Sequence, residues 1–353
     1  MLSRLPARWS ASGLLAGLCV AVVATGGLWL LGVLGLPGLP LGGFVAFMAV
    51  YTGLLGYAMT RWVRPPPTPW NSWPSTPPKR SAPPSSPPSR GTGRLLVEAD
   101  VDMVAFTGSA AAGADVAARA AGRRVSLELG GNAPALVLPD APGDTCAQLA
   151  RACVYNVGQS CAAPARVITL RENYERVVEE LTAAARECLA GRDFGPLDNA
   201  GQAARYDGIV TASAARRNFA ADIAPRPGEE NGFWRPTRIL ADLPDDDPAV
   251  VEEVFGPLLT VQHAEDLDAA VALADGVPQA LAASVWTRDL TTGLELAGRL
   301  NAEEAWLNCH LVQTAELPHG GRGASGHGTD LSTLALHEYQ RPKTVTARLL
   351  RGT

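Results

Sequence analysis

A cysteine and a glutamate stand out in this sequence because together they could carry out nucleophilic chemistry. Cys161 lies in the stretch "YNVGQSCAAPARV" (residues 155–167), after Gly-Gln-Ser and before Ala-Ala-Pro. A thiolate held in the open is a strong nucleophile, whereas a cysteine packed among apolar residues is inert. Both interpretations of Cys161 are open at this point. The catalytic one requires a base, a place for an electron acceptor and a site that stabilises an oxyanion.

The candidate base is Glu128, thirty-three residues before Cys161, in "VSLELGGNAPALVL" (residues 125–138). Two leucines flank it, and buried surroundings make a carboxyl group a better proton acceptor near neutral pH. Two glycines follow at once and allow another backbone or a ligand to approach closely. The alternative is a carboxylate that faces solvent at the end of a strand.

The elements around these two residues alternate between apolar strands and amphipathic helices. From Gly91 onward we expect strands within 101–109, 125–138 (two strands around a glycine turn), 165–170, 258–264, 281–287 and 304–308. We expect helices within 110–122, 144–158, 173–191, 267–276 and 291–300. Such alternation predicts an α/β fold with mostly parallel sheets. The helix over 144–158 then delivers the chain to Cys161.

Five motifs, in this order and register, resemble the NAD(P)-dependent aldehyde dehydrogenase superfamily: "VDMVAFTGSAAAG", "VSLELGGNAPALVL", "YNVGQSCAAPARV", "EEVFGPLLTV" and "PHGGRGASGHGTDLS". The last of them looks most like the aminobutyraldehyde dehydrogenases. The resemblance implies an aldehyde dehydrogenase-like catalytic domain over residues 131–308. It also implies an incomplete Rossmann-like cofactor domain over 91–130, completed by a C-terminal segment over 309–353. Within that segment, 341–350 resembles the last oligomerisation strand, and the oligomeric state stays open.

The resemblance also implies roles for individual residues. Cys161 matches the nucleophile that forms a thiohemiacetal and then a thioester with a small aldehyde, and Glu128 matches the carboxylate that activates water. Asn308 lies where the family has an asparagine near the active site, although a strand-end hydrogen bond would also explain it. The implied cofactor is NAD or NADP, and the residues that match its binding site are Gly108, Ser109, Gly113, Leu129, Glu253 and Phe255.

The sequence departs from the family pattern ahead of residue 91. No lysine matches the one that holds the adenosine ribose, and we expect an N-terminally truncated member of the family. Asn71, in "TPWNSWP", resembles the asparagine that stabilises the oxyanion. It is equally explained as a chance match in a proline-rich tract, and a deletion or a shifted reading frame is a third explanation. The alternative to an active enzyme is therefore a catalytically inactive relic or a membrane-anchored binding module.

Residues 1–63 have the composition of a transmembrane hairpin. Trp9 to Thr60 contains no charged residue, and two apolar runs, 13–36 and 41–60, are each near the ~20 residues that span a bilayer. A cleaved signal peptide is the competing interpretation. Arginines flank both ends, which places both ends in the cytoplasm and predicts a membrane protein with a cytoplasmic C-terminal domain. The eleven prolines of 64–90 predict an extended linker.

Charge and cysteine content exclude other classes of function. The net charge is −5, and no acidic residue precedes Glu98, so the C-terminal part is acidic and has no basic face for nucleic acid. The six cysteines include no CxxC pair and no spacing typical of metal ligands, and free thiols are expected.

Overall fold

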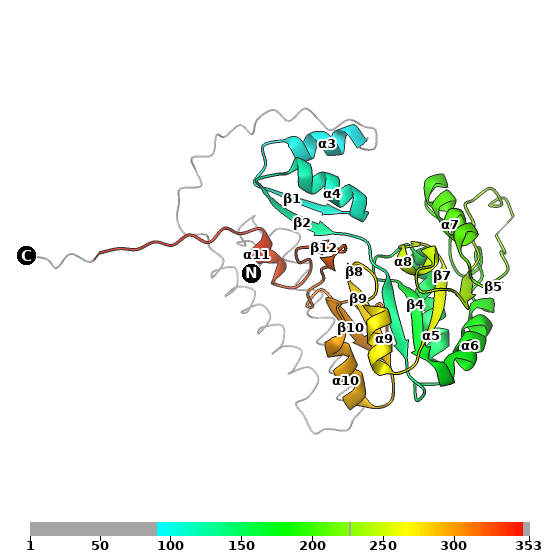
Figure 1. Ribbon diagram of the computed structural model, residues 1–353. Helices are drawn as coiled ribbons and strands as arrows, with labels where there is room; N and C mark the ends of the chain where they lie inside the picture. Colours follow the sequence, from blue (N-terminus) through cyan, green and yellow to red (C-terminus); the bar gives the residue numbers. More distant parts are fainter. Residues whose placement is uncertain (1–89, 226, 349–353) are drawn as a thin grey trace, which may run out of the picture. The chain divides into compact units, whose positions relative to one another are not determined.

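The computed structural model describes residues 90–225 and 227–348 (Figure 1). The membrane hairpin, most of the linker and Asn71 lie outside the described residues, so these predictions stay predictions. The strands are β1 (Met103–Thr107), β2 (Arg124–Glu128), β3 (Ala133–Val137), β4 (Pro164–Leu170), β5 (Arg217–Ala220), β6 (Arg238–Ala241), β7 (Leu258–Ala264), β8 (Gln279–Ala280), β9 (Ala282–Trp286), β10 (Glu304–Leu307), β11 (Arg322–Gly323) and β12 (Gly326–His327).

The described part of the chain also contains helices, which pack against the sheets. They are α3 (Arg90–Glu98), α4 (Ala110–Arg119), α5 (Thr145–Val154), α6 (Tyr174–Arg186), α7 (Ala200–Ala212), α8 (Pro248–Val251), α9 (Leu267–Ala274), α10 (Leu290–Arg299) and α11 (Ala335–Glu338), with 3-10 turns η2 (Tyr155–Gly158) and η3 (Arg171–Asn173). Short polar residues begin several of them. Ser109, Asp266 and Asp289 each accept a hydrogen bond from a backbone amide in the first turn of α4, α9 and α10, respectively.

The larger sheet has seven strands in the order β10-β9-β3-β4-β7-β6-β5. Each neighbouring pair is parallel except β5 and β6, which are antiparallel at one edge. Figure 1 shows helices packed on both faces of this sheet. Parallel strands need crossover connections, and helices supply most of them here. The prediction of an α/β fold with mostly parallel strands is confirmed for this sheet.

Successive residues of the central strands point into two separate cores. Val137 and Val167 pack with α5 and α6, whereas Leu136 and Ile168 pack with α9 and α10. Strands that are buried on both faces read as continuous apolar runs, and this is why the sequence pattern located them. The result is a three-layer α/β/α arrangement.

A smaller sheet contains β1, β2 and β12; β1 and β2 precede the strands of the large sheet along the chain, and β12 follows them. β1 runs parallel to β2, and β12 pairs antiparallel with the other side of β2. Val97 of α3, Val116 of α4 and Leu127 of β2 share its apolar core. β2 ends at Glu128, and after four intervening residues the chain enters β3 of the large sheet. Glu128 therefore lies where the chain passes from one sheet to the other.

Two sequence-based predictions of helix ends need correction. The helix over 144–158 ends at Val154, because Asn156 and Val157 adopt positive φ angles of 49° and 56°, which a right-handed helix excludes. The helix over 173–191 ends at Arg186, and Gly191 lies in a turn with φ +92°. Residues 341–348 form no strand within this chain, and the resemblance of 341–350 to an oligomerisation strand stays a prediction.

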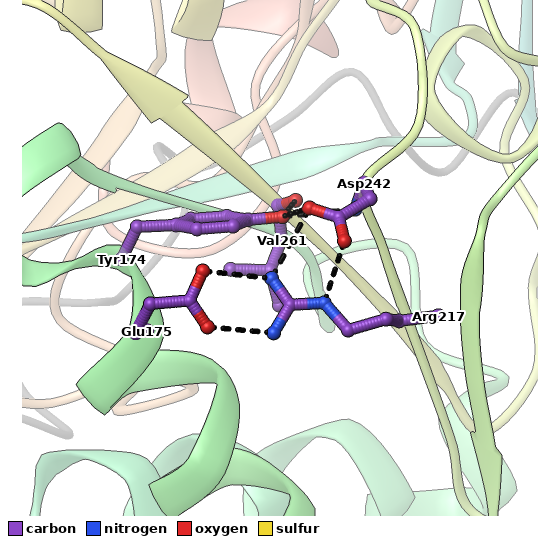
Figure 2. A network of polar contacts seen from close by, with 5 residues as sticks. All are labelled: Tyr174, Glu175, Arg217, Asp242 and Val261. Carbon is purple, nitrogen blue, oxygen red and sulfur yellow. Dashed lines mark hydrogen bonds and ion pairs between the residues drawn. The ribbon is translucent and has the colours of Figure 1, made fainter.

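A polar network joins the edge strand β5 to α6 (Figure 2). The Arg217 guanidinium pairs with Glu175 at 2.8 Å and with Asp242 at 2.7 Å, and it lies 5.2 Å from the centre of the Tyr174 ring. The Tyr174 hydroxyl donates to Asp242 Oδ1 over 3.0 Å. These contacts hold the edge strand β5, for which the sequence pattern predicted no strand. In the described part of the chain, no helix has the length and apolar character needed to span a membrane.

Candidate active site

The loop that carries Cys161 has an unusual backbone. Asn156, Val157 and Gly158 all have positive φ angles, and a Cβ atom on Gly158 would lie 2.3 Å from the carbonyl oxygen of Gly256. Only glycine fits this contact without displacing backbone. A β-branched valine in the left-handed region is rare and is maintained by the surrounding structure. The loop holds Cys161 partly exposed, in contrast to the buried Cys146, Cys153 and Cys188.

Two glycines bring the Glu128 segment against the Cys161 loop. A Cβ atom on Gly131 would lie 2.1 Å from the Cys161 carbonyl oxygen, and one on Gly130 would lie 1.9 Å from Glu253 Oε2. The Gly131 amide donates to Glu253 Oε1 over 3.0 Å. Each glycine therefore permits a contact that any side chain would block. The sequence analysis predicted such a close approach for this pair.

Glu128 is a buried carboxyl group without hydrogen-bond partners in the described structure. It is 6% exposed, and neither carboxyl oxygen has a hydrogen-bond partner. Burial, more than any neighbouring charge, raises the pKa of Glu128 to about 7, while His319 acts in the opposite direction. The buried interpretation of Glu128 is therefore confirmed against the solvent-facing one. A carboxyl group with this pKa can gain and release a proton near neutral pH.

His319 contacts both of these residues. Its Nε2 lies 4.0 Å from Glu128 Oε2, and interaction with the Cys161 side chain is the largest cause of the raised pKa of the imidazole. On the other side, Nδ1 lies 3.3 Å from Glu304 Oε1 and 3.0 Å from Gln313 Nε2. The side chains of Cys161 and Glu304 raise the pKa of His319 to about 10. Cys161 and Glu128 therefore share one neighbouring imidazole.

A second histidine fixes the backbone directly after Cys161. His310 Nε2 lies 2.9 Å from the Ala162 carbonyl oxygen, and its Nδ1 lies 2.8 Å from Ser284 Oγ. The indole of Trp286 donates to the same Ser284 oxygen over 2.9 Å, so the hydroxyl hydrogen is free to point to Nδ1. Burial lowers the pKa of His310 to about 4. The neutral ring therefore donates from Nε2 and orients the chain beside Cys161.

The residues that match the cofactor site fall into two groups. Ser109 caps α4, the partly buried Gly108 precedes it, and a Cβ atom on Gly113 would lie 2.5 Å from Leu129, so α4 packs directly on the residue after Glu128. Glu253 and Phe255 form the other group. Phe255 has φ +52°, and Gln202 Nε2 donates a hydrogen bond of 2.7 Å to the Phe255 carbonyl oxygen.

These residues fit a dinucleotide in their donor and acceptor chemistry. Burial raises the pKa of Glu253 to about 6, so its carboxylate is ionised at neutral pH and suits ribose hydroxyl donors. The first turn of α4 carries backbone amides suited to a phosphate group. The Gly108 amide itself donates to the Glu128 carbonyl oxygen over 3.0 Å, which ties this turn to β2. The two groups meet around Leu129, Gly130 and Gly131.

A buried arginine supports the same region by hydrogen bonds to backbone carbonyl oxygens. Arg166 of β4 is 1% exposed and donates to the carbonyl oxygens of Asn132, Leu273 and Ala274, the last two at the C-terminus of α9. A cation is favoured at that end of a helix. The Asn308 amide pairs with both backbone groups of Thr287 at 2.7 and 3.0 Å. Asn308 therefore has the strand-end role that the sequence analysis kept as its alternative.

The structure thus brings together Cys161, Glu128 and the glycine pair, with Glu253 directly behind the glycines. Gly108 reaches this region through its hydrogen bond to the Glu128 carbonyl oxygen, and Gly113 through its contact with Leu129. Sequence reasoning missed His319, Glu304 and His310. His319 was part of a quoted motif, and its position before two glycines was the one local signal, since those glycines pack against other backbone.

A cavity of about 840 Å³ lies elsewhere, between α5, α6 and the loop that contains Phe194. It borders the Tyr155 and Asn156 turn and is lined by Arg151 and Cys188, but Cys161 and Glu128 are not among its lining residues. The polar cluster around His319, and not this cavity, brings together the residues that could do chemistry.

Comparison with known proteins agrees with this arrangement. Residues 86–345 match the model of the aldehyde dehydrogenase family. The chain is 31% identical over 259 residues to aldehyde dehydrogenase, cytosolic 1, of Macroscelides proboscideus; the match covers 71% of this chain and 52% of that protein. The chain therefore spans about half the length of the curated relatives it matches.

Two solved structures share the fold. An NAD-dependent aldehyde dehydrogenase from Sinorhizobium meliloti superposes with a TM-score of 0.68 at 31% identity, over 75% of this chain and 55% of that one. A gamma-glutamyl-gamma-aminobutyraldehyde dehydrogenase from Burkholderia cenocepacia superposes with a TM-score of 0.65 at 34% identity, over 70% and 52%. The motifs, the two sheets and the family match agree, and this chain belongs to the aldehyde dehydrogenase family.

Proposed function

We propose that the protein oxidises an aldehyde to a carboxylic acid with NAD(P) as the electron acceptor. One observation carries the proposal: the partly exposed thiol of Cys161 and the buried carboxyl group of Glu128 both face the His319 imidazole. The family membership and the NAD-dependent enzyme among the similar structures support it.

In the proposed reaction, the Cys161 thiolate attacks the aldehyde carbonyl carbon. A carbon–sulfur bond forms, and the carbonyl electron pair moves to oxygen. NAD(P)⁺, when bound, supplies the acceptor for the hydride whose departure converts the thiohemiacetal into a thioester. Glu128 then takes a proton from the water that attacks the thioester, and the thiolate leaves as the acid forms. With a pKa near 7, Glu128 is ionised for this step at pH above about 7.

Glu253, Phe255 and Leu129 are the residues proposed to hold the nicotinamide end of the cofactor. Gly108, Ser109 and Gly113 at the start of α4 are proposed to hold the phosphates. The contact between Gly113 and Leu129 supports this assignment, because it joins α4 to the Glu128 segment. Asn71, outside the described residues, remains the proposed donor to the oxyanion.

The test is turnover by the full-length protein, followed as absorbance of the reduced nicotinamide. Cys161→Ser should abolish it, whereas Cys309→Ser is the matched control. Cys309 packs in the same apolar cluster and is also partly exposed, but burial raises the pKa of its thiol. Glu128→Gln should retain one burst of reduced cofactor per active site and lose steady turnover. Turnover that survives Cys161→Ser would refute the mechanism.

The inactive alternative makes a separate prediction. A relic without a cofactor site should show the same melting temperature with and without NAD⁺ or NADP⁺. A ligand that binds the folded state at a hundred times its Kd stabilises that state by ~2.7 kcal/mol. We therefore expect a clear rise in melting temperature with one of the two dinucleotides, and that result would eliminate the relic.

For the substrate we propose an aminoaldehyde of the aminobutyraldehyde type. The carboxyl groups of Glu303, Glu304 and Asp330 all act electrostatically on Glu128, so the site is acidic and suits a substrate with a cationic amine. The motif "PHGGRGASGHGTDLS" supports the same choice. A kcat/KM for 4-aminobutyraldehyde at least tenfold above that for butyraldehyde is expected; equal values would overturn this assignment.

We also propose that residues 13–36 and 41–60 anchor the chain in a membrane with residues 91–353 in the cytoplasm. The uncharged stretch from Trp9 to Thr60, with arginines at both ends, supports this. The protein should stay in the membrane fraction after a carbonate wash, and protease added outside spheroplasts should spare the C-terminal part. Release by carbonate would contradict the anchor.

A further inference from the structure

We propose that His319, oriented by Glu304, is the base that removes the proton from Cys161. This inference deepens the proposed function and assigns the two proton transfers to two different residues. The proton moves from Cys161 Sγ to the imidazole and produces a thiolate–imidazolium pair, with no oxidant or further reactant required. Glu128 is then left for the water that attacks the thioester.

The geometry has the three parts of an activated nucleophile: a thiol, an imidazole that contacts it, and a carboxylate that orients the imidazole. The Cys161 side chain lies close enough to the imidazole to be the largest cause of its raised pKa. Its Nδ1 faces Glu304 Oε1 at 3.3 Å, which leaves Nε2 for the nucleophile side. The side chains of His319 and Glu304 are 12% and 11% exposed, so water competes little for this contact.

The fold fixes the position of the histidine backbone. The His319 amide donates to the Asp330 carbonyl oxygen over 2.8 Å, and the Asp330 amide returns a bond of 2.6 Å. Glu304 is the first residue of β10, at the edge of the seven-stranded sheet. The base and its carboxylate therefore come from separate segments that the fold brings together.

Gln313 limits which proton arrangement is possible. Its Nε2 donates to Glu304 Oε2 over 3.0 Å and also lies 3.0 Å from His319 Nδ1. An amide nitrogen can only donate, so Gln313 can hydrogen-bond to His319 Nδ1 only when Nδ1 carries no proton. When Nδ1 instead carries the proton and donates it to Glu304, the Nε2 atom of the neutral ring is free to accept a proton. Glu304 and Gln313 should therefore have opposite effects on the ability of His319 to accept the Cys161 proton.

The charged groups around the imidazole favour its protonated form. Glu304 and Glu128 face it directly, and Asp330 and Glu303 lie close enough to raise the pKa of Glu128. The raised pKa of His319, about 10, has the sign that these carboxylates and a thiolate partner would give. Below that value the imidazolium persists. The positive charge of this imidazolium would stabilise a thiolate beside it.

The experiment measures alkylation of Cys161 by iodoacetamide in the full-length protein, without aldehyde or cofactor, from pH 6 to pH 9.5. A Cys161→Ser variant supplies the background from the other cysteines. The wild-type rate should change less than about twofold between pH 6.5 and 7.5. In His319→Gln the thiol should titrate with an ordinary pKa of ~8.5, so the rate should rise about tenfold over the same interval.

Further variants separate a proton-transfer role from a structural one. Glu304→Gln should move the profile toward that of His319→Gln, whereas Gln313→Ala should leave the wild-type plateau in place. The matched control is His337→Gln, an exposed histidine on α11. Melting temperatures identify unfolded variants, and His319→Asn offers a second removal of the base if His319→Gln does not fold.

The outcomes distinguish this inference from the proposed function. A pH profile that is the same in wild type, His319→Gln and His319→Asn would overturn the assignment of the base, even if Cys161 proves essential for turnover. A plateau that depends on His319 and Glu304 would support it, even if no aldehyde is oxidised. Glu128→Gln should keep the plateau; its loss in that variant alone would make Glu128 the base and overturn the inference.

Discussion

Glu128→Gln should make the protein more stable, and increasingly so as pH rises. The folded protein has a Glu128 pKa of about 7 against 4.5 for an ordinary carboxyl group. Between these values the folded state binds more protons than the unfolded state, so Glu128 lowers stability as pH rises through this interval. Worked through the linkage relation, the cost to the folded state is ~1 kcal/mol at pH 5 and ~3 kcal/mol at pH 8.

Glutamine has nearly the shape of the protonated carboxyl group and cannot ionise. The substitution should therefore recover most of this free energy, which corresponds to a gain of roughly 2–4 °C in melting temperature per kcal/mol for a body of this size. The assay is thermal unfolding of wild type and variant, monitored by circular dichroism at pH 5, 6, 7 and 8. We expect the difference between the two proteins to widen by ~5 °C or more from pH 5 to pH 8.

The matched control is Glu295→Gln on α10, where the carboxyl group is 68% exposed and should give no pH-dependent difference. A Glu128→Gln variant whose melting temperature differs from wild type by the same amount at pH 5 and pH 8 would refute the reasoning. It would mean that Glu128 is solvated or paired. In the expected case the same substitution stabilises the fold and removes turnover. Such a result is typical of a residue that contributes to activity at a cost in stability.

Three further substitutions test the surroundings of the site. Arg166→Met should lower stability by roughly 3 kcal/mol or more, because three buried carbonyl oxygens lose a charged donor; an unchanged denaturant midpoint would contradict this role. His310→Gln should destabilise the protein more at pH 7 than at pH 4.5. The unfolded wild type takes up the His310 proton near pH 6.5 and the folded one only near 4, so the wild-type protein loses this part of its stability as pH falls from 6.5 towards 4. Arg217→Ala should cost no more than ~1 kcal/mol in a urea titration, since that side chain is 36% exposed; a loss of 3 kcal/mol would show that the network is more than a surface brace.

Local patterns predicted the elements that are buried on both faces. The strand expected over 258–264 is β7, and the one over 165–170 is β4 within one residue. Their apolar runs fit only a position inside the sheet. The hairpin of β5 and β6 escaped prediction because it lies at the sheet edge, where polar residues such as Arg217 hold it by contacts to another element.

The site divides in the same way. The sequence alone predicted the candidate pair, since Cys161 and Glu128 each stand in a local motif whose glycines and apolar neighbours indicate close packing. Only the tertiary structure decided which side chain stands between them. His319 comes 158 residues after Cys161 and meets Glu304 from β10, and a proton-transfer contact depends on such distances in space. The number of residues between two side chains along the chain does not determine their distance in space. That distance is determined by the packing of the two sheets around Gly130 and Gly131.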